Sequence, residues 1–192
     1  MKKRMSYPLV QDLLRQGRIA RYAGRETEAR VHYNEALAAA RSAKDWSMES
    51  EALAGLGYTE EPVNPALARD LLRQAIALIE LRAKNDRVAN VRLHLALACL
   101  DSGDAAEARR LLEQSLPVVE KAGYDFAIAL GLEVLGMVLV AEGNPAEALD
   151  HFRRAAELRR QPGGQEASPL WWRNRRDAVI GDLLQDRRPV AE

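Results

Sequence analysis

Four alanines recur through the chain at nearly constant spacing. Ala29, Ala68, Ala108 and Ala148 are separated by 39, 40 and 40 residues. A large apolar residue follows each alanine four positions later: Tyr33, Leu72, Leu112 and Phe152. A small residue follows three positions after that: Ala36, Ala75, Ser115 and Ala155. Self-similarity at a period of about 40 residues is typical of stacked repeats and not of one globular core.

A second series of small residues precedes the alanines, namely Gly17, Gly57, Ala96 and Gly136. Glycine inside a helix costs roughly 0.5–1 kcal/mol relative to alanine, so these glycines need a compensating close contact. We expect the second helix of the same repeat to approach there, with its recurring alanine against the missing side chain. The large apolar residues would then fill the space between repeats.

Proline, glycine and short polar residues mark the ends of the expected helices. Asn64 directly precedes Pro65. Asparagine is a common helix cap, and proline suits the first helical position because the N–H that it lacks would have no intrahelical partner there. Gly143 is placed to end a helix, and Asp45 and Asp125 are placed to cap the next ones. These signals predict eight helices in pairs, over residues 8–23 with 26–43, 46–60 with 65–83, 86–102 with 105–122, and 125–142 with 145–160.

The expected class is all-α, because Ala and Leu dominate and no stretch alternates apolar and polar residues as a sheet would require. One continuous array accounts for most of the chain. Its divisions are a flexible N-terminus (1–7), four repeats within 8–160 (8–43, 46–83, 86–122 and 125–160), a loop (161–168), a C-terminal capping helix (169–185) and a flexible tail (186–192).

Residues 9–160 resemble the tetratricopeptide repeat, in which a small residue late in the first helix is followed by Ala, a bulky residue and Ala in the second. The fourth repeat matches best, with Gly136 leading to Ala148, Phe152 and Ala155. The period exceeds the usual value of about 34 residues. It is similar to that of the long-repeat subgroup in bacterial maltose-regulon-type activators and kinesin light chains. The resemblance implies a right-handed superhelical solenoid of four helix-turn-helix repeats with a C-terminal capping helix.

The resemblance also implies a concave groove lined by the first helix of each repeat. The groove should be polar and cationic toward its N-terminal end and largely apolar toward its C-terminal end, apart from one glutamate. Such a surface suits a peptide or helix with an acidic group and a hydrophobic anchor. The candidate partner-binding residues are Leu14, Arg18, Tyr22, Ala54, Tyr58, Leu93, Leu97, Leu100, Glu133, Met137 and Val140.

The favoured function is therefore that of a scaffold or adaptor that binds a peptide or helical segment of a partner protein. An alternative is a homo-oligomeric structural subunit, such as a homodimer, or a regulatory or sensor module. The helix at 126–142 supports the alternative, because it is apolar nearly all round and carries only Glu133 before its end. The ninth helix, a second copy or a ligand would have to cover it.

Balanced charge argues against nucleic acid and membranes as partners. Lys plus Arg and Asp plus Glu both number 28, so no overall field favours an anionic surface. The segment Trp171–Arg176 could stack on bases, but it fits better as part of the capping helix. The longest apolar stretch, 126–141, is shorter than a membrane span. We expect a cytoplasmic protein.

No residue pattern predicts catalysis, a cofactor or a metal site. His32, His94 and His151 belong to different repeats and lack a matching cluster of ligands. Cys99 lies among apolar residues and should be an inert buried thiol. The adjacent Glu60 and Glu61 should point in different directions. We therefore do not expect an enzyme.

Overall fold

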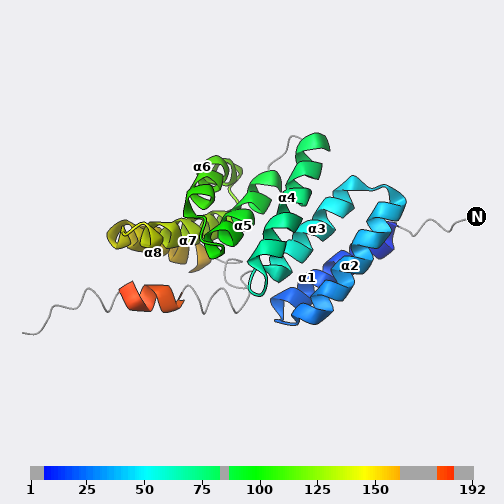
Figure 1. The fold of residues 1–192 in the computed structure, drawn as a ribbon, viewed down its shortest axis with the longest axis horizontal. Helices are drawn as coiled ribbons and strands as arrows, with labels where there is room; N and C mark the ends of the chain where they lie inside the picture. Colours follow the sequence, from blue (N-terminus) through cyan, green and yellow to red (C-terminus); the bar gives the residue numbers. More distant parts are fainter. Residues whose placement is uncertain (1–6, 83–86, 161–176, 184–192) are drawn as a thin grey trace, which may run out of the picture.

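The computed structural model describes residues 7–82, 87–160 and 177–183, and within these ranges the regular structure is helical, with no strand. Each helix end lies within one residue of the range expected from the sequence. The eight helices are α1 (Tyr7–Tyr22), α2 (Glu26–Ala43), α3 (Trp46–Glu60), α4 (Pro65–Arg82), α5 (Arg87–Asp101), α6 (Ala105–Ala122), α7 (Asp125–Ala141) and α8 (Pro145–Arg160). They follow one another as a row of pairs (Figure 1).

The helices form a solenoid of consecutive packed pairs, so the expected fold class is confirmed. Each first helix packs on the second helix of its own pair, and each second helix packs on the next first helix. In addition, α1 lies against α3 and α5 lies against α7, whereas α3 and α5 pack on one another less extensively. The solenoid therefore leaves room between α3 and α5, the first helices of the second and third pairs.

The C-terminal capping helix is only partly within the described residues. Residues 177–183 are helical, and Leu183 is buried at one end of this stretch. The expected loop at 161–168, the start of the helix at 169 and the tail at 186–192 lie outside the described residues, as does most of the expected N-terminal segment. The capping role remains an expectation.

In three of the helix pairs the two helices approach closely at a glycine, as expected. The side chain that comes nearest to the glycine differs from the expected one. A Cβ atom on these glycines would come within 2.7 to 2.9 Å of the large apolar residue of the second helix. The facing pairs are Gly17 with Tyr33, Gly57 with Leu72, and Gly136 with Phe152. Contrary to the expectation, the recurring alanine is not the nearest neighbour: the large side chain comes closest at all three glycines, and the Ala68 carbonyl oxygen lies 3.5 Å from the Cβ position of Gly57.

One of these large side chains also joins two repeats. A Cβ atom on Gly55 of α3 would lie 2.3 Å from the ring of Tyr33, so the ring fits between α1 and α3 only because two glycines face it. Gly131 has the same role on α7, where a Cβ atom would lie 2.5 Å from Leu116 of α6. Close packing of this kind tolerates few added atoms.

Most of the expected helix caps are present. Asp45 accepts hydrogen bonds at 3.1 Å from two backbone N–H groups of α3, and Asn64 accepts one at 3.1 Å from α4. The prediction for Asp125 is wrong, because the N-cap of α7 is Tyr124, and Asp125 is the first helical residue. A carboxylate there still lies near the positive end of the helix dipole.

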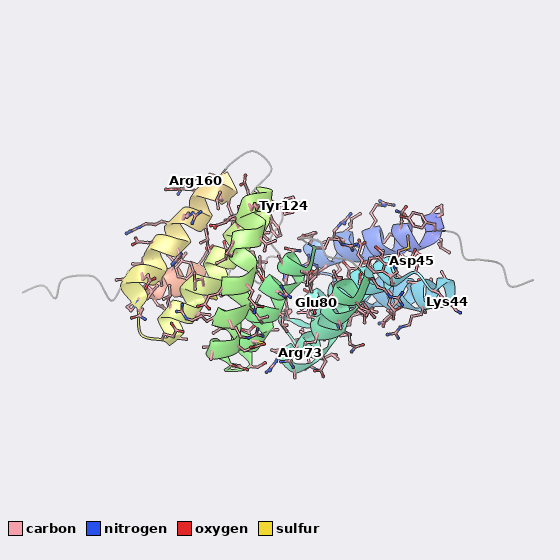
Figure 2. All side chains as sticks on the ribbon, turned by 90° about the horizontal axis from the view of Figure 1, so that it is seen from above. Lys44, Asp45, Arg73, Glu80, Tyr124 and Arg160 are labelled. Carbon is pink, nitrogen blue, oxygen red and sulfur yellow. The ribbon has the colours of Figure 1, made fainter. Side chains whose placement is uncertain are left out.

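Left-handed residues end several helices. Gly24, Gly103 and Gly143 have positive φ, as expected, and so does Gly123. Lys44 ends α2 with φ 56°, and it is the one non-glycine residue with positive φ in the described ranges. Figure 2 shows Lys44 and Asp45 at the opposite end of the array from Arg160.

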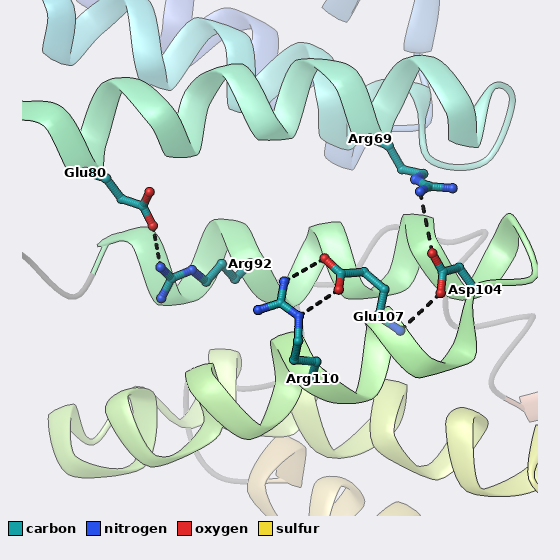
Figure 3. Close-up of polar contacts among 6 residues, drawn as sticks. All are labelled: Arg69, Glu80, Arg92, Asp104, Glu107 and Arg110. Atoms are coloured by element: carbon teal, nitrogen blue, oxygen red, sulfur yellow. Dashed lines mark hydrogen bonds and ion pairs between the residues drawn. The ribbon is translucent and has the colours of Figure 1, made fainter.

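Ion pairs connect the surfaces of successive repeats. Arg92 of α5 pairs with Glu80 of α4, and Arg69 of α4 lies 3.7 Å from Asp104 (Figure 3). Asp104 also caps α6 by accepting a hydrogen bond at 3.1 Å from the N–H of Glu107. Exposed pairs contribute only about 0–1 kcal/mol each. Their main effect is on how neighbouring repeats align.

Candidate functional site

A cavity of about 920 Å³ lies among the first helices of the solenoid. Its walls come from α1, α3 and α5, together with single residues of α2 and α4 and the start of α7. It occupies the region where α3 and α5 pack least extensively. A space of this size matches the clefts that hold small ligands or the side chains of a peptide.

Five of the candidate binding residues line this cavity: Leu14, Arg18, Tyr22, Ala54 and Tyr58. They come from α1 and α3 and lie on the turns that the family resemblance assigned to the groove. Arg18 is exposed, and Tyr22 and Tyr58 are half-buried. The N-terminal part of the expected groove is therefore a real concavity.

The other six candidates do not line the cavity. Leu100 and Val140 are half-buried, whereas the remaining four are buried: Leu93, Leu97, Glu133 and Met137. These four side chains are among the buried residues of α5 and α7. Their part in binding stays a prediction.

Arg21 lines the cavity and was not among the candidates. Its side chain is stacked on two aromatic rings, with the guanidinium carbon 4.4 Å from the centroid of Tyr22 and 5.4 Å from that of Tyr58. The residue is 6% exposed, and its Nε and Nη1 atoms are buried without a hydrogen-bond partner. The guanidinium is therefore held by contacts with two rings, while two of its nitrogens have no hydrogen-bond partner.

Two tyrosine hydroxyls of this wall are strongly held in the protonated form. Burial raises the pKa of Tyr58, and the nearby Glu61 carboxylate raises it further. Burial also raises the pKa of Tyr33, against the opposing charge of Arg21. Both residues belong to the cavity lining.

A buried histidine and carboxylate join the second and third repeats beside the cavity. His94 Nδ1 lies 2.8 Å from Glu61 Oε1, and the His94 ring stacks on Tyr58 with centroids 4.0 Å apart. The sequence pattern does not predict this contact, because His94 and Glu61 are far apart in the chain and meet only through the placement of α3 and α5.

The cavity lining carries an excess of positive charge. Arg87 donates a hydrogen bond to Ser47 Oγ at 3.0 Å and lies 3.8 Å from Glu51. Among the described residues, three arginines and two carboxylates line the cavity, namely Arg18, Arg21, Arg87, Glu51 and Asp125. This end of the expected groove is cationic.

The charge of Glu133 on α7 is neutralised inside the protein. Glu133 is fully buried and accepts two hydrogen bonds from Arg159 of α8, at 2.9 and 2.8 Å. The Arg159 guanidinium carbon also lies 5.0 Å from the ring centroid of Phe126. Glu133 is thus part of the core of the fourth repeat and not an exposed group of the groove.

Comparison with known proteins supports the repeat assignment. Residues 87–161, which span the third and fourth helix pairs, match the family model of the tetratricopeptide repeat. No curated protein matches the chain. Tetratricopeptide repeats are in general non-catalytic modules of protein–protein interaction. In the described part of the chain, no helix is long and apolar enough to cross a membrane.

Proposed function

We propose that this chain is an interaction module that binds a peptide or helical segment of a partner protein in the cavity among α1, α3 and α5. The cavity itself is the observation that carries the proposal, because it combines aromatic rings and cationic groups from separate repeats. Well-packed helices hold these groups, so little ordering entropy is lost when a ligand binds. The direct contacts are assigned to Leu14, Arg18, Tyr22, Ala54 and Tyr58.

The test replaces a half-buried residue of the cavity wall. Tyr22→Glu adds a charge where an apolar partner group would lie, and Ile19→Glu is the matched control on the same helix. Ile19 is 49% exposed and does not line the cavity. Partners are recovered from native cell extract by cross-linking to the tagged full chain. We expect Tyr22→Glu to lower recovery about tenfold and Ile19→Glu to leave it unchanged, which corresponds to about 1.4 kcal/mol of binding.

Equal recovery with both variants would show that the partner does not use this cavity. Thermal melting of each variant serves as the folding control. Met137 is only 5% exposed, so a charge there would disrupt the core and could not test binding.

The alternative of an assembly interface on the fourth repeat has less support from the surface. Among the described residues, the large apolar side chains that are exposed all lie at or before Tyr124, and none belongs to α7 or α8. Sedimentation of the full chain tests this alternative, since a stable dimer would sediment at twice the monomer mass.

Three further parts of the proposal rest on sequence features. The cytoplasmic location and the absence of nucleic-acid partners rest on balanced charge and a single cysteine. The assignment to the long-repeat subgroup rests on the spacing of the recurring alanines.

A further inference from the structure

Aromatic side chains are scarce in this chain, yet half of them line one cavity. The sequence holds five tyrosines, two phenylalanines and three tryptophans. Four of the tyrosines and one phenylalanine line the cavity among α1, α3 and α5, namely Tyr22, Tyr33, Tyr58, Tyr124 and Phe126. The ring of His94, which stacks on Tyr58, also belongs to the lining. This concentration favours a ligand with a flat aromatic surface, because such rings stack on aromatic side chains.

Most of these rings are not fully used by the packing of the helices. Tyr33 is buried against Gly17 and Gly55 and belongs to the core. Tyr124, by contrast, is 54% exposed, and three further rings are half-buried: Tyr22, Tyr58 and Phe126. The cavity therefore offers aromatic surface that is open to a bound ring.

Two polar groups of the cavity lining lack a hydrogen-bond partner among the described residues. Arg21 is 6% exposed, and its Nε and Nη1 atoms are buried donors without an acceptor. Asn90 Oδ1 is a buried acceptor without a donor. Both residues line the cavity. Buried polar groups without partners are costly, so a ligand that pairs with both gains binding energy.

A stack of side chains connects these two groups. The Arg21 guanidinium carbon lies 5.4 Å from the ring centroid of Tyr58, and the rings of Tyr58 and His94 lie 4.0 Å apart. Asn90 precedes His94 by four residues, so both lie on the same face of α5. A ligand of one or two fused rings is of the right size to reach from Arg21 toward Asn90.

The unpaired groups require both an acceptor and a donor from the ligand. An ionised carboxylate only accepts hydrogen bonds, so it would leave Asn90 Oδ1 without a partner. A ring carbonyl next to a ring N–H, the lactam edge of several nucleobases, supplies both. A negative charge is not required, because the contacts with Tyr22 and Tyr58 already stabilise the cation of Arg21.

We propose that the cavity binds a small nucleoside-like molecule, whose base presents its carbonyl to Arg21 and its N–H to Asn90 and stacks on the half-buried rings. This inference goes beyond the proposed function, since the ligand is a small molecule and not a partner protein. Both ligands would use Tyr22 and Tyr58 and would compete for the cavity. The 28 basic and 28 acidic residues balance, which favours a free nucleoside over a polynucleotide.

The test compares matched probes on the full-length protein labelled with ¹⁵N. Inosine carries a ring carbonyl next to a ring N–H, and purine riboside has the same sugar and fused rings without them. Benzoate tests a charged acceptor, and N-acetylglycine methylamide tests a peptide bond without an aromatic ring. Binding is followed by NMR through the backbone amides of α1, α3 and α5. We expect inosine to bind with a Kd of about 1 mM and each of the other three about tenfold more weakly.

Two substitutions locate the preference for inosine over purine riboside. Arg21→Met removes the donors and Asn90→Leu removes the acceptor, so each should reduce the preference to less than about twofold. Arg15→Met and Asn34→Leu are the matched controls and should keep it, because both residues are exposed and neither lines the cavity. Thermal melting checks the fold of each variant. If Arg21→Met does not fold, Asn90→Leu decides, since Asn90 is only half-buried.

The outcomes separate this inference from the proposed function. Equal binding of inosine and purine riboside would overturn the inference, as would a preference that survives either substitution in a folded variant. Benzoate that binds more tightly than inosine would overturn it in favour of an anion, and an inosine trinucleotide that does so would overturn it in favour of RNA.

The peptide-bond probe links the test to the proposed function. If N-acetylglycine methylamide binds as tightly as inosine, the inference fails, whereas the proposed function gains support. If no probe shifts the cavity signals at about 10 mM, the inference fails, and the cross-linking experiment alone decides the proposed function.

Discussion

The first and last repeats each bury an arginine, but only the last repeat neutralises it. Arg159 of α8 donates two hydrogen bonds to Glu133, and both side chains are buried. Arg21 of α1 is equally buried but is held by the rings of Tyr22 and Tyr58. The two arginines are therefore buried to a similar extent, but only Arg159 has a carboxylate partner among the described residues.

This difference indicates which part of the molecule is built for stability and which for binding. The charges of a buried ion pair neutralise one another within the fold, and removing one partner destabilises the protein. A buried cation without its acid is a candidate functional group, especially when it lies in a cavity. The following experiments test the comparison, from the largest expected effect to the smallest.

Glu133→Ala should have the largest effect, because it leaves Arg159 buried without its carboxylate. We expect the free energy of unfolding in denaturant to fall by about 3–5 kcal/mol. Glu147→Ala is the control, since Glu147 is exposed at the start of α8 and should change stability by less than about 0.5 kcal/mol. A loss below about 1 kcal/mol for Glu133→Ala would mean that the pair contributes no more than a surface salt bridge.

Alanine substitution of the packing glycines should have similar effects in the first and last repeats. A new Cβ atom would lie 2.9 Å from Tyr33 in Gly17→Ala and 2.8 Å from Phe152 in Gly136→Ala. Each should cost about 1–3 kcal/mol by overpacking, measured as a lower melting temperature. Gly181→Ala is the control, because nothing lies within 4 Å of the added atom. Unchanged melting of both packing variants would contradict the assigned contacts.

Tyr58→Phe should change how stability depends on alkaline pH. Burial raises the pKa of Tyr58 in the folded protein above its ordinary value of 10.0. Above about pH 10 the tyrosine loses its proton in the unfolded chain but keeps it in the folded protein. The free energy of unfolding therefore falls as pH rises, by up to about 1.4 kcal/mol per pH unit. The contribution is fully present below pH 10.

The phenylalanine variant lacks this proton, so its free energy of unfolding should fall less steeply between about pH 10 and 11. Denaturant titrations at successive pH values give the slope. Tyr7→Phe is the matched control, because Tyr7 is 60% exposed. Identical slopes for Tyr58→Phe and the parent would show that the hydroxyl ionises freely in the folded state.

Arg21→Met should have the smallest effect on stability, within about 1 kcal/mol of the parent. The loss of two cation–π contacts, at about 0.5–1 kcal/mol each, is offset by removing an uncompensated buried charge. Arg159→Met, by contrast, leaves Glu133 unpaired and should cost about 3–5 kcal/mol. If chemical denaturation gave equal losses for the two variants, Arg21 would have a counter-charge within the fold, and the comparison would fail.

The helices could be predicted because their signals are local. A cap such as Asn64, a helix-ending glycine such as Gly143 and a recurring alanine each depend on a few neighbouring residues, so the helix ends agreed within one residue. The side chain nearest each glycine was harder to predict, because it depends on how the two helices of a pair pack. Tyr33 and Phe152 come closest to Gly17 and Gly136, where the sequence pattern favoured the recurring alanines.

The candidate residues of α1 and α3 and those of α7 lie in different surroundings. Tyr22 and Tyr58 line the cavity, whereas Glu133 and Met137 are buried and do not line it. Whether neighbouring helices cover a residue depends on packing between repeats, which the local sequence pattern does not contain. Arg21 was missed because its importance lies in a missing partner, and a sequence does not show which carboxylates a folded chain brings within reach.

The way the helices pack also governs how fast this chain can fold. Among α1–α8, helices in extensive contact are neighbours or next neighbours along the chain. Short sequence separation keeps the entropic cost of loop closure low, so formation of the first helical pair needs no distant segment. An early pair can serve as a template for the next, and growth during synthesis on the ribosome can proceed from α1 toward α8 before the C-terminus has emerged.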